Sequence, residues 1–343
     1  MKEPSKSDWA ALYQAAIAFQ HASPWEWMDN EDLFAVENPY DGEMGYCSIL
    51  GSGQEEFGLG IFLGDKGFVG YLELISSEVE PEDIDESIML PLLSMLFVDR
   101  GTLQKKDLDV IRSLGLRFRG RNAWPLFRSQ RPGYAPWFLE KEEVLFLSIA
   151  IHQALVVATK VRNNELDLWG KESEDLILTR YCRDNDWLEE WREPKIPDSS
   201  SQTHTEAVGA VNEARLHLLR TRAGRLSGAW ELDIFVLPMP IGPASSRPYF
   251  PSCFLTVERK LGLIIDSKLT KPWLTLSEKQ DELIQILEKA EQLPRHIWVR
   301  SDKIRLIVEP ITRSLGINLR VGRLSMLEEA KASLHNYLSG HDA

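Results

Sequence analysis

The sequence WELDIFVL, residues 230–237, opens the stretch that decides the fold of the second half of the chain. Three apolar segments of strand length come first, and helical and strand patterns then alternate. The pattern predicts strands at 230–237, 250–257, 262–269, 296–300 and 317–321, and helices at 277–291, 303–315 and 325–338. Three strands followed by helix, strand, helix, strand and helix predict an α+β domain built on a mixed sheet.

The chain outside this stretch is long enough for a second domain. Its 343 residues are 43% hydrophobic, which suits two buried cores. Charge also divides the chain, because the residues from 228 onward carry 15 Lys and Arg against 14 Asp and Glu, whereas the residues before 228 carry 24 against 38. The polar sequence PDSSSQTHT at 197–205 is typical of a linker. We therefore predict an α+β domain at 1–197, a linker at 198–208 and a second domain at 209–343.

Composition restricts where the protein works and what it binds. No apolar run approaches the roughly 20 residues that span a bilayer, and the amino-terminal residues lack the apolar core of a signal peptide. The three cysteines and seven histidines are scattered, without the spacing of zinc ligands. These features predict a cytoplasmic protein with free thiols. The net charge of −13 disfavours non-specific binding of nucleic acid, although a local basic patch can override it.

One segment of the first half is rich in arginine and aromatic residues. It has the sequence LRFRGRNAWPLFRSQRPGYAPWFL at 116–139, and no acid occurs between Asp109 and Glu140. Arginine forks and aromatic faces are used to bind phosphates and stacked bases. The candidate ligand-binding residues are Arg117, Arg119, Arg121, Trp124, Arg128 and Arg131, with Trp137 as a further contact. The other interpretation is an irregular, proline-pinned loop whose aromatics fill a core and whose arginines pair with acids of the same domain.

Three pieces of the second half resemble retroviral-type integrases and transposases of the ribonuclease H-like fold. They are WELDIF at 230–235, FLTVERKLGLIIDSKL at 254–269 and QLPRHIWVRSDK at 292–303. In that fold, carboxylates converge at strand ends to hold two divalent metals. The resemblance implies Asp233 and Asp302 as metal-binding and catalytic acids, with Glu328 or Glu329 as the third acid and Glu278 or Glu282 as the glutamate that ribonuclease H-type enzymes add.

The chain also departs from the active members of that fold. Lys303 and Ile304 follow Asp302, where integrases usually have a small, glycine-containing turn. We therefore predict a non-catalytic binding or regulatory protein without a cofactor, whose partner is an anionic ligand or nucleic acid at the arginine–aromatic segment. The alternative is a nuclease or strand-transferase that acts on phosphodiesters with Mg²⁺ or Mn²⁺.

A further resemblance covers nearly the whole chain. SPWEWM at 23–28, RGRNAWPLFRS at 119–129, WELDIF at 230–235 and RPYFP at 247–251 resemble stretches of an uncharacterised bacterial family. Members of that family carry two successive domains of unknown function. The resemblance implies a bacterial or archaeal origin and assigns no activity.

Overall fold

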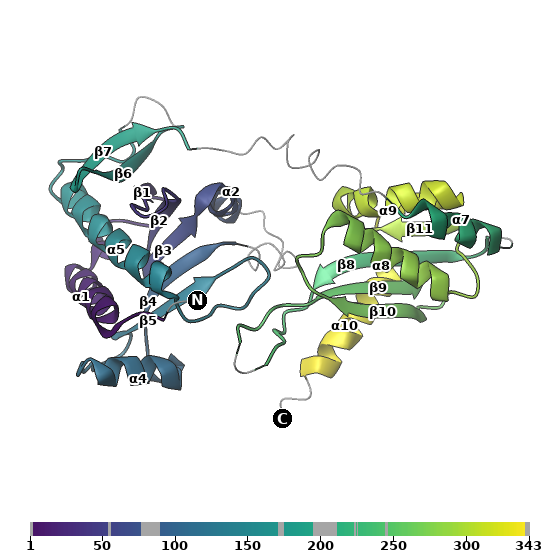
Figure 1. Ribbon diagram of the computed structural model, residues 1–343, viewed down its shortest axis with the longest axis horizontal. Coiled ribbons are helices and arrows are strands. Elements are labelled where there is room, and N and C mark those ends of the chain that lie inside the picture. The colour runs from purple at the N-terminus through teal and green to yellow at the C-terminus, as the bar shows by residue number, and fades with distance from the viewer. Residues whose placement is uncertain are drawn as a thin grey trace. The chain divides into compact units, whose positions relative to one another are not determined.

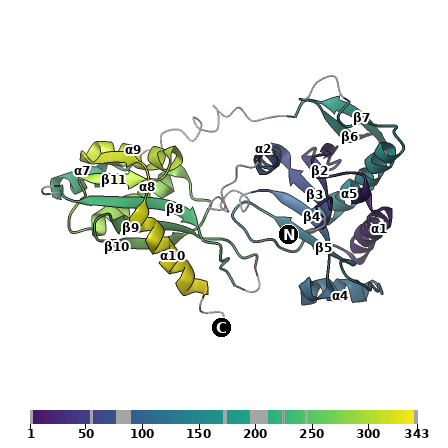
Figure 2. The same cartoon turned by 180° about the vertical axis from the view of Figure 1, so that it is seen from behind.

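The chain folds into two compact units, Met1–Pro197 and Asp198–Ala343, each built on its own sheet (Figures 1 and 2). The predicted linker at 198–208 lies outside the residues that the structure describes. The structure is a computed structural model that describes residues 3–53, 56–76, 90–170, 175–194, 211–222, 224, 226–243 and 246–339.

The first unit contains a seven-stranded sheet of order β5-β4-β3-β2-β1-β6-β7. Neighbouring strands are antiparallel except β1 and β6, which are parallel. The strands are β1 Phe34–Glu37, β2 Met44–Leu50, β3 Phe57–Leu63, β4 Leu92–Val98, β5 Trp124–Gln130, β6 Ile177–Arg183 and β7 Asp186–Arg192. The α-helices are α1 Lys6–Ala22, α2 Gly64–Ile75, α4 Lys105–Ser113 and α5 Lys141–Arg162, with short 3-10 turns at Pro24–Glu26 and Arg100–Thr102.

Helices cover both faces of this sheet. On one face, α1 and α5 pack side by side over the central strands (Figure 1). On the other face, Phe68 and Tyr71 of α2 pack against Tyr46 and Phe62 of the strands. Contrary to the expectation that no apolar run approaches the length that spans a bilayer, α5 could cross a membrane by length and composition, but more than half of its most apolar window is buried inside the unit. The apolar character of α5 is therefore explained by its place in the core.

The strand β5 corrects one prediction. One of the two interpretations of the segment 116–139 was an irregular loop, yet residues 124–130 pair with β4 along their whole length. Pro125 lacks an N–H for a sheet ladder, but β5 lies at the edge of the sheet, where a proline is tolerated. The prolines and arginines of the segment made the strand hard to recognise from the sequence. Its inward residues, among them Phe127, belong to the main core.

The second unit has the ribonuclease H-like α+β fold that the sequence predicts. Its five-stranded sheet has the order β10-β9-β8-β11-β12, so the first strand is central, the next two continue on one side, and the last two lie on the other. β8, β9 and β10 are antiparallel, whereas β11 and β12 run parallel to β8. The elements are α7 Glu213–Arg222, β8 Ala229–Val236, β9 Ser252–Glu258, β10 Ile264–Thr270, α8 Leu276–Lys289, β11 His296–Val299, α9 Asp302–Leu315, β12 Asn318–Val321 and α10 Ser325–Ser339.

Alternation along β8 separates the two faces of this sheet. Trp230 and Leu232 belong to the core that includes residues of α7, α8 and α9. Phe235 belongs to the core on the opposite face, where Leu327 of α10 packs. Because successive side chains of a strand point to opposite faces, Glu231 and Asp233 lie on the side of α10.

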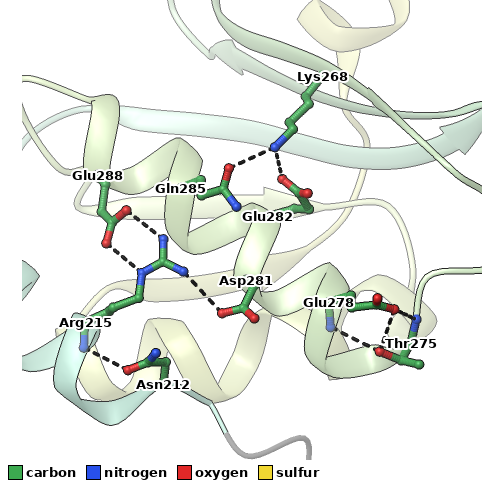
Figure 3. Close-up of polar contacts among 9 residues, drawn as sticks. All are labelled: Asn212, Arg215, Lys268, Thr275, Glu278, Asp281, Glu282, Gln285 and Glu288. Carbon is green, nitrogen blue, oxygen red and sulfur yellow. Dashed lines mark hydrogen bonds and ion pairs between the residues drawn. The ribbon is translucent and has the colours of Figure 1, made fainter.

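Arg215 joins α7 to α8 (Figure 3). Its guanidinium donates to both carboxylate oxygens of Glu288, at 2.8 and 2.6 Å, and to Asp281 at 3.2 Å. The hydrogen bond from Arg215 is the main reason why the pKa of Glu288 lies below its ordinary value. A carboxylate with a lowered folded-state pKa stabilises the fold above its unfolded pKa, and this stabilisation is lost as the pH falls through the folded-state pKa.

We therefore expect Arg215→Met to destabilise the protein at pH 7 by up to about 1 kcal/mol, because the pair is partly exposed. The difference from the wild type should shrink as the pH falls through the lowered folded-state pKa of Glu288, because the protonated carboxyl no longer pairs with Arg215 as an ion. Urea unfolding at pH 7 and pH 3 measures this. Arg220→Met on the same helix is the control, since Arg220 is exposed and no ion pair joins it to the described residues. If the loss of unfolding free energy in Arg215→Met did not change with pH, the ion pair between Arg215 and Glu288 would not be its cause.

Candidate functional site

Three of the predicted arginines are exposed on one loop between α4 and β5. Along this arginine loop, residues 115–123, the side chains alternate: Leu116 and Phe118 pack against the core of the first unit, while Arg117 and Arg119 are exposed. Arg121 is exposed as well. No ion pair or hydrogen bond joins the side chains of these three arginines to any residue that the structure describes. The loop therefore presents three guanidinium groups to solvent.

The backbone of the loop is held in place by contacts with neighbouring elements. The amide of Asn122 donates to the Asp99 carboxylate at 2.9 Å, and Gln20 of α1 donates to the carbonyl of Asn122 at 3.4 Å. Asn122 has a positive φ of 49°, a conformation that asparagine tolerates better than most residues. These hydrogen bonds hold the backbone at the end of the loop next to Arg121.

The remaining members of the predicted site serve the fold of the first unit. Arg128 donates to both oxygens of Asp107 at 2.8 Å and lies 4.8 Å from the ring centre of Phe138. Arg131 pairs at 2.9 Å with Glu140 and with Glu143, the two acids of the capping box of α5. Trp124 and Trp137 are partly buried, and Trp124 packs against the main core. The internal pairing expected by the second interpretation is therefore found for Arg128 and Arg131, whereas ligand binding by Arg117, Arg119 and Arg121 stays a prediction.

The residues around the arginine loop make the local charge positive. Residues 99–131 contain nine Lys and Arg against three Asp, in a chain with a net charge of −13. Arg100 lies over the ring of Trp124, at 5.8 Å from the ring centre, and so stands beside the end of the loop. Arg112 of α4 is 63% exposed, although it pairs with Asp109. Exposed cations therefore outnumber exposed acids in this part of the chain.

In the second unit, Asp233 is held by cations of the chain itself. Its side chain is 4% exposed, and its Oδ2 accepts from Lys331 Nζ at 2.7 Å and from Arg300 Nε at 3.1 Å. The other carboxylate oxygen accepts from the amide of Ile234 at 2.9 Å. Lys331 also lies 3.8 Å from the ring centre of Phe235. Both oxygens of Asp233 are therefore engaged by donors of the protein.

The other three acids predicted to bind metal or act in catalysis do not converge on Asp233 as a group. Asp302 begins α9, is 80% exposed and pairs with Arg305 in the next turn at 3.0 Å. Glu328 lies 4.0 Å from Arg300 and 3.5 Å from Arg323, so it shares a cation with Asp233. Glu329 is exposed. Of the four acids, the structure brings only Asp233 and Glu328 to one cation.

The two glutamates of α8 also have protein partners (Figure 3). Glu278 forms the capping box of the helix with Thr275. Glu282 pairs with Lys268 of β10, which also donates to Gln285 at 2.9 Å. Among the described residues, which include all six acids named above, no three Asp, Glu, His or Cys side chains are placed to hold a metal ion. The arrangement that a two-metal mechanism requires is therefore not formed by these acids.

Sequence reasoning missed the role of Glu231. This side chain is fully buried, its Oε2 accepts from the amide of Leu327 in the first turn of α10 at 2.8 Å, and Arg259 lies 3.1 Å from its Oε1. A carboxylate at a helix amino-terminus is stabilised by the free amides and by the helix dipole. The strict alternation of WELDIF was the available signal, because it places Glu231 on the same face as Asp233.

The fold and these contacts define the class: a two-unit α+β protein whose second unit is ribonuclease H-like and pairs its central-strand carboxylate with Lys and Arg. The model of the domain of unknown function DUF7309 matches residues 9–180, half of the chain, so the chain belongs to that family. The model of a second domain of unknown function, DUF6930, matches residues 215–335. The predicted pair of successive domains is thereby confirmed, whereas the bacterial origin and the cytoplasmic location stay predictions.

Among solved structures, the chain is similar to one from a cryoEM structure of the simian T-cell lymphotropic virus intasome in complex with PP2A regulatory subunit B56 gamma. The identity is 17%, the TM-score is 0.26, and the match covers 34% of this chain and 44% of that chain. The fold assignment rests on the strand order of the second unit and not on this match. No curated protein matches the chain.

Proposed function

We propose that the protein is a non-catalytic binding protein whose first unit binds a phosphate-bearing polyanion, with single-stranded nucleic acid as the leading class, through Arg117, Arg119 and Arg121. The observation that carries the proposal is that these three arginines are exposed and make no ion pair with the described acids, in a chain of net charge −13. Two other arginines of the same segment are paired internally. Arginine is suited to this task because its planar guanidinium can bind two phosphate oxygens at once.

The spacing of the arginines supports a strand-like ligand. Arg117 and Arg119 are two residues apart and both are exposed, whereas Leu116 and Phe118, before and between them, pack against the core. The aromatic residues nearest to the three arginines, Phe118, Trp124 and Phe127, pack in or against the core, so the proposal relies on charge and not on base stacking. Binding driven by phosphate charge has little sequence specificity and depends strongly on salt.

The contacts at Asp233 support the non-catalytic part of the proposal. A metal-dependent nuclease needs carboxylates with free oxygens to hold divalent ions. At Asp233 the positive charge comes from Lys331 and Arg300 instead. We infer that the second unit keeps the fold of a nuclease or transferase without its metal chemistry.

The test is fluorescence anisotropy with a labelled oligothymidylate at several salt concentrations, with inorganic polyphosphate as a competing anion. We expect the triple variant Arg117→Gln, Arg119→Gln, Arg121→Gln to bind more weakly. The slope of the logarithm of the binding constant against the logarithm of salt should fall by up to about 2, since each lost phosphate contact to a single strand accounts for about 0.7.

The matched control removes the same charge from other exposed positions: Arg183→Gln, Arg313→Gln and Arg323→Gln. This control should keep most of the affinity and of the salt slope. An equal loss in both triple variants would indicate a general charge effect, and undetectable binding by the wild type at low salt would refute the proposal. If polyphosphate displaced the oligothymidylate as well as unlabelled oligothymidylate does, the loop would bind phosphate chains in general and would not be specific for nucleic acid.

A further inference from the structure

A cavity of about 570 Å³ lies in the first unit, away from the arginine loop in the sequence. Its volume is within the range of roughly 300 to 1,000 Å³ that is typical of small-molecule sites. The apolar floor is formed by Phe68 and Tyr71 of α2, which are almost fully buried. Tyr71 is fixed by a hydrogen bond from its hydroxyl to the carbonyl of Asn30 at 2.8 Å. The cavity therefore has preformed aromatic walls.

Trp169 lines the same cavity in an unusual state for a large aromatic side chain. It is 63% exposed, yet its indole Nε1 donates to Asp32 at 2.7 Å and its amide donates to Asp167 at 2.9 Å. These bonds fix the ring without burying it. An ordered and exposed indole at the edge of an aromatic cavity is suited to contact with a ligand, particularly with a cation.

The charges that line the cavity are all negative. Of the described residues that line it, Glu31, Asp175 and Glu193 are acidic and none is basic. Neither Glu31 nor Glu193 forms an ion pair with a described residue. The pKa of Tyr71 is raised, first by burial and then by the charges of Glu31, Asp29 and Asp32. A negative potential therefore reaches the aromatic floor.

We propose that this cavity binds an organic cation, an ammonium or guanidinium group carried on a short apolar chain. The cationic group would lie between the face of Trp169 and the carboxylates of Glu31 and Glu193, and the apolar chain would lie over Phe68 and Tyr71. Aromatic faces attract cations through their quadrupole, and carboxylates add charge and hydrogen bonds. An anionic ligand is excluded by the same carboxylates. The site is independent of the proposed function of the arginine loop.

The test is isothermal titration calorimetry on the full chain with cadaverine, agmatine and choline, and with 1-pentanol and glutarate as neutral and anionic controls. We expect the cations to bind and the controls not to bind. Trp169→Ala should weaken cation binding by about threefold or more, the size expected for one exposed cation–π contact. Glu193→Gln should weaken cation binding more at low salt than at high salt, because salt screens the attraction between exposed charges.

The matched control variants alter similar residues outside the cavity. Tyr40→Ala removes an aromatic ring that is 65% exposed, and Glu142→Gln removes an exposed acid. Neither should change cation binding. Tighter binding of agmatine than of an arginine-containing tripeptide would support a small-molecule ligand, and the reverse would support an arginine side chain of a partner protein. The absence of cation binding by the wild type, or equal binding of pentanol, would overturn the proposal, as would undiminished binding by both Trp169→Ala and Glu193→Gln.

Discussion

Replacing Gly58 with alanine is expected to destabilise the first unit by more than about 2 kcal/mol, at the upper part of the range for overpacking. Gly58 lies in β3, and a Cβ at this position would stand 1.9 Å from the carbonyl oxygen of Met95 in the adjacent β4. That oxygen belongs to the backbone of a paired strand, so it cannot rotate away as a side chain would. The two strands would have to separate, and the sheet hydrogen bonds between them would weaken.

Gly60, two residues further along the same strand, is the matched control. A Cβ there would meet its nearest atom, Leu92 Cδ1, at 3.7 Å, an ordinary contact. Gly60→Ala should therefore change the midpoint of urea unfolding little, whereas Gly58→Ala should lower it strongly. Equal midpoints for the two variants would show that β3 and β4 are not as closely packed at Gly58 as the structure indicates.

Replacing Asp233 with alanine is the second change with a large expected effect. The substitution removes the carboxylate that Lys331 and Arg300 both contact, although Arg300 keeps Glu328 at 4.0 Å. Removing one partner of a buried ion pair costs about 3–5 kcal/mol. Since the two cations are 24% and 34% exposed, we expect a loss of about 2–3 kcal/mol in the free energy of unfolding. Chemical denaturation monitored by circular dichroism measures this loss.

Two further variants separate a charge effect from a general loss of packing. Asp302→Ala removes an exposed acid that pairs with Arg305, and it should cost less than about 1 kcal/mol. The double variant Asp233→Leu, Lys331→Met should recover part of the loss, because it removes a cation together with its partner. A penalty for Asp233→Ala no larger than that for Asp302→Ala would contradict the ion-pair assignment. Calorimetric titration with Mn²⁺ should give the same result for the wild type and Asp233→Ala.

The fold of the second unit could be predicted because each of its strands and helices has a recognisable pattern in the local sequence. WELDIFVL alternates with period two, and the three strands precede the helices in the order of the ribonuclease H-like fold. The first unit was harder, because β5 contains Pro125 and lies among arginines. Only its pairing with β4 reveals it as a strand. Local pattern fails there because a sheet edge permits residues that a central strand does not.

The candidate sites were predicted as sets of residues but not as arrangements. The sequence marks Arg117 and Arg128 as equal members of one basic segment. The structure separates them, because Arg128 meets Asp107 from 21 residues earlier, whereas Arg117 meets no described acid. Likewise, Asp233 is an acid at the expected place in the fold, but Lys331 reaches it from 98 residues later in the chain. Such pairings depend on the approach of distant elements and leave no local signal.

The sequence by itself determined the element order of the second unit, the α+β class and the positions of the charged segments, because helix and strand periods and charge runs are properties of neighbouring residues. The tertiary structure decided which of these charges are free. Asp107, Glu140, Arg300 and Lys331 come into ion pairs through packing. The cavity lined by Trp169 and Glu193 likewise exists only where separate elements meet. The physical reason is that a charged side chain is free to bind a ligand only if the fold brings no opposite charge of the protein within hydrogen-bonding distance.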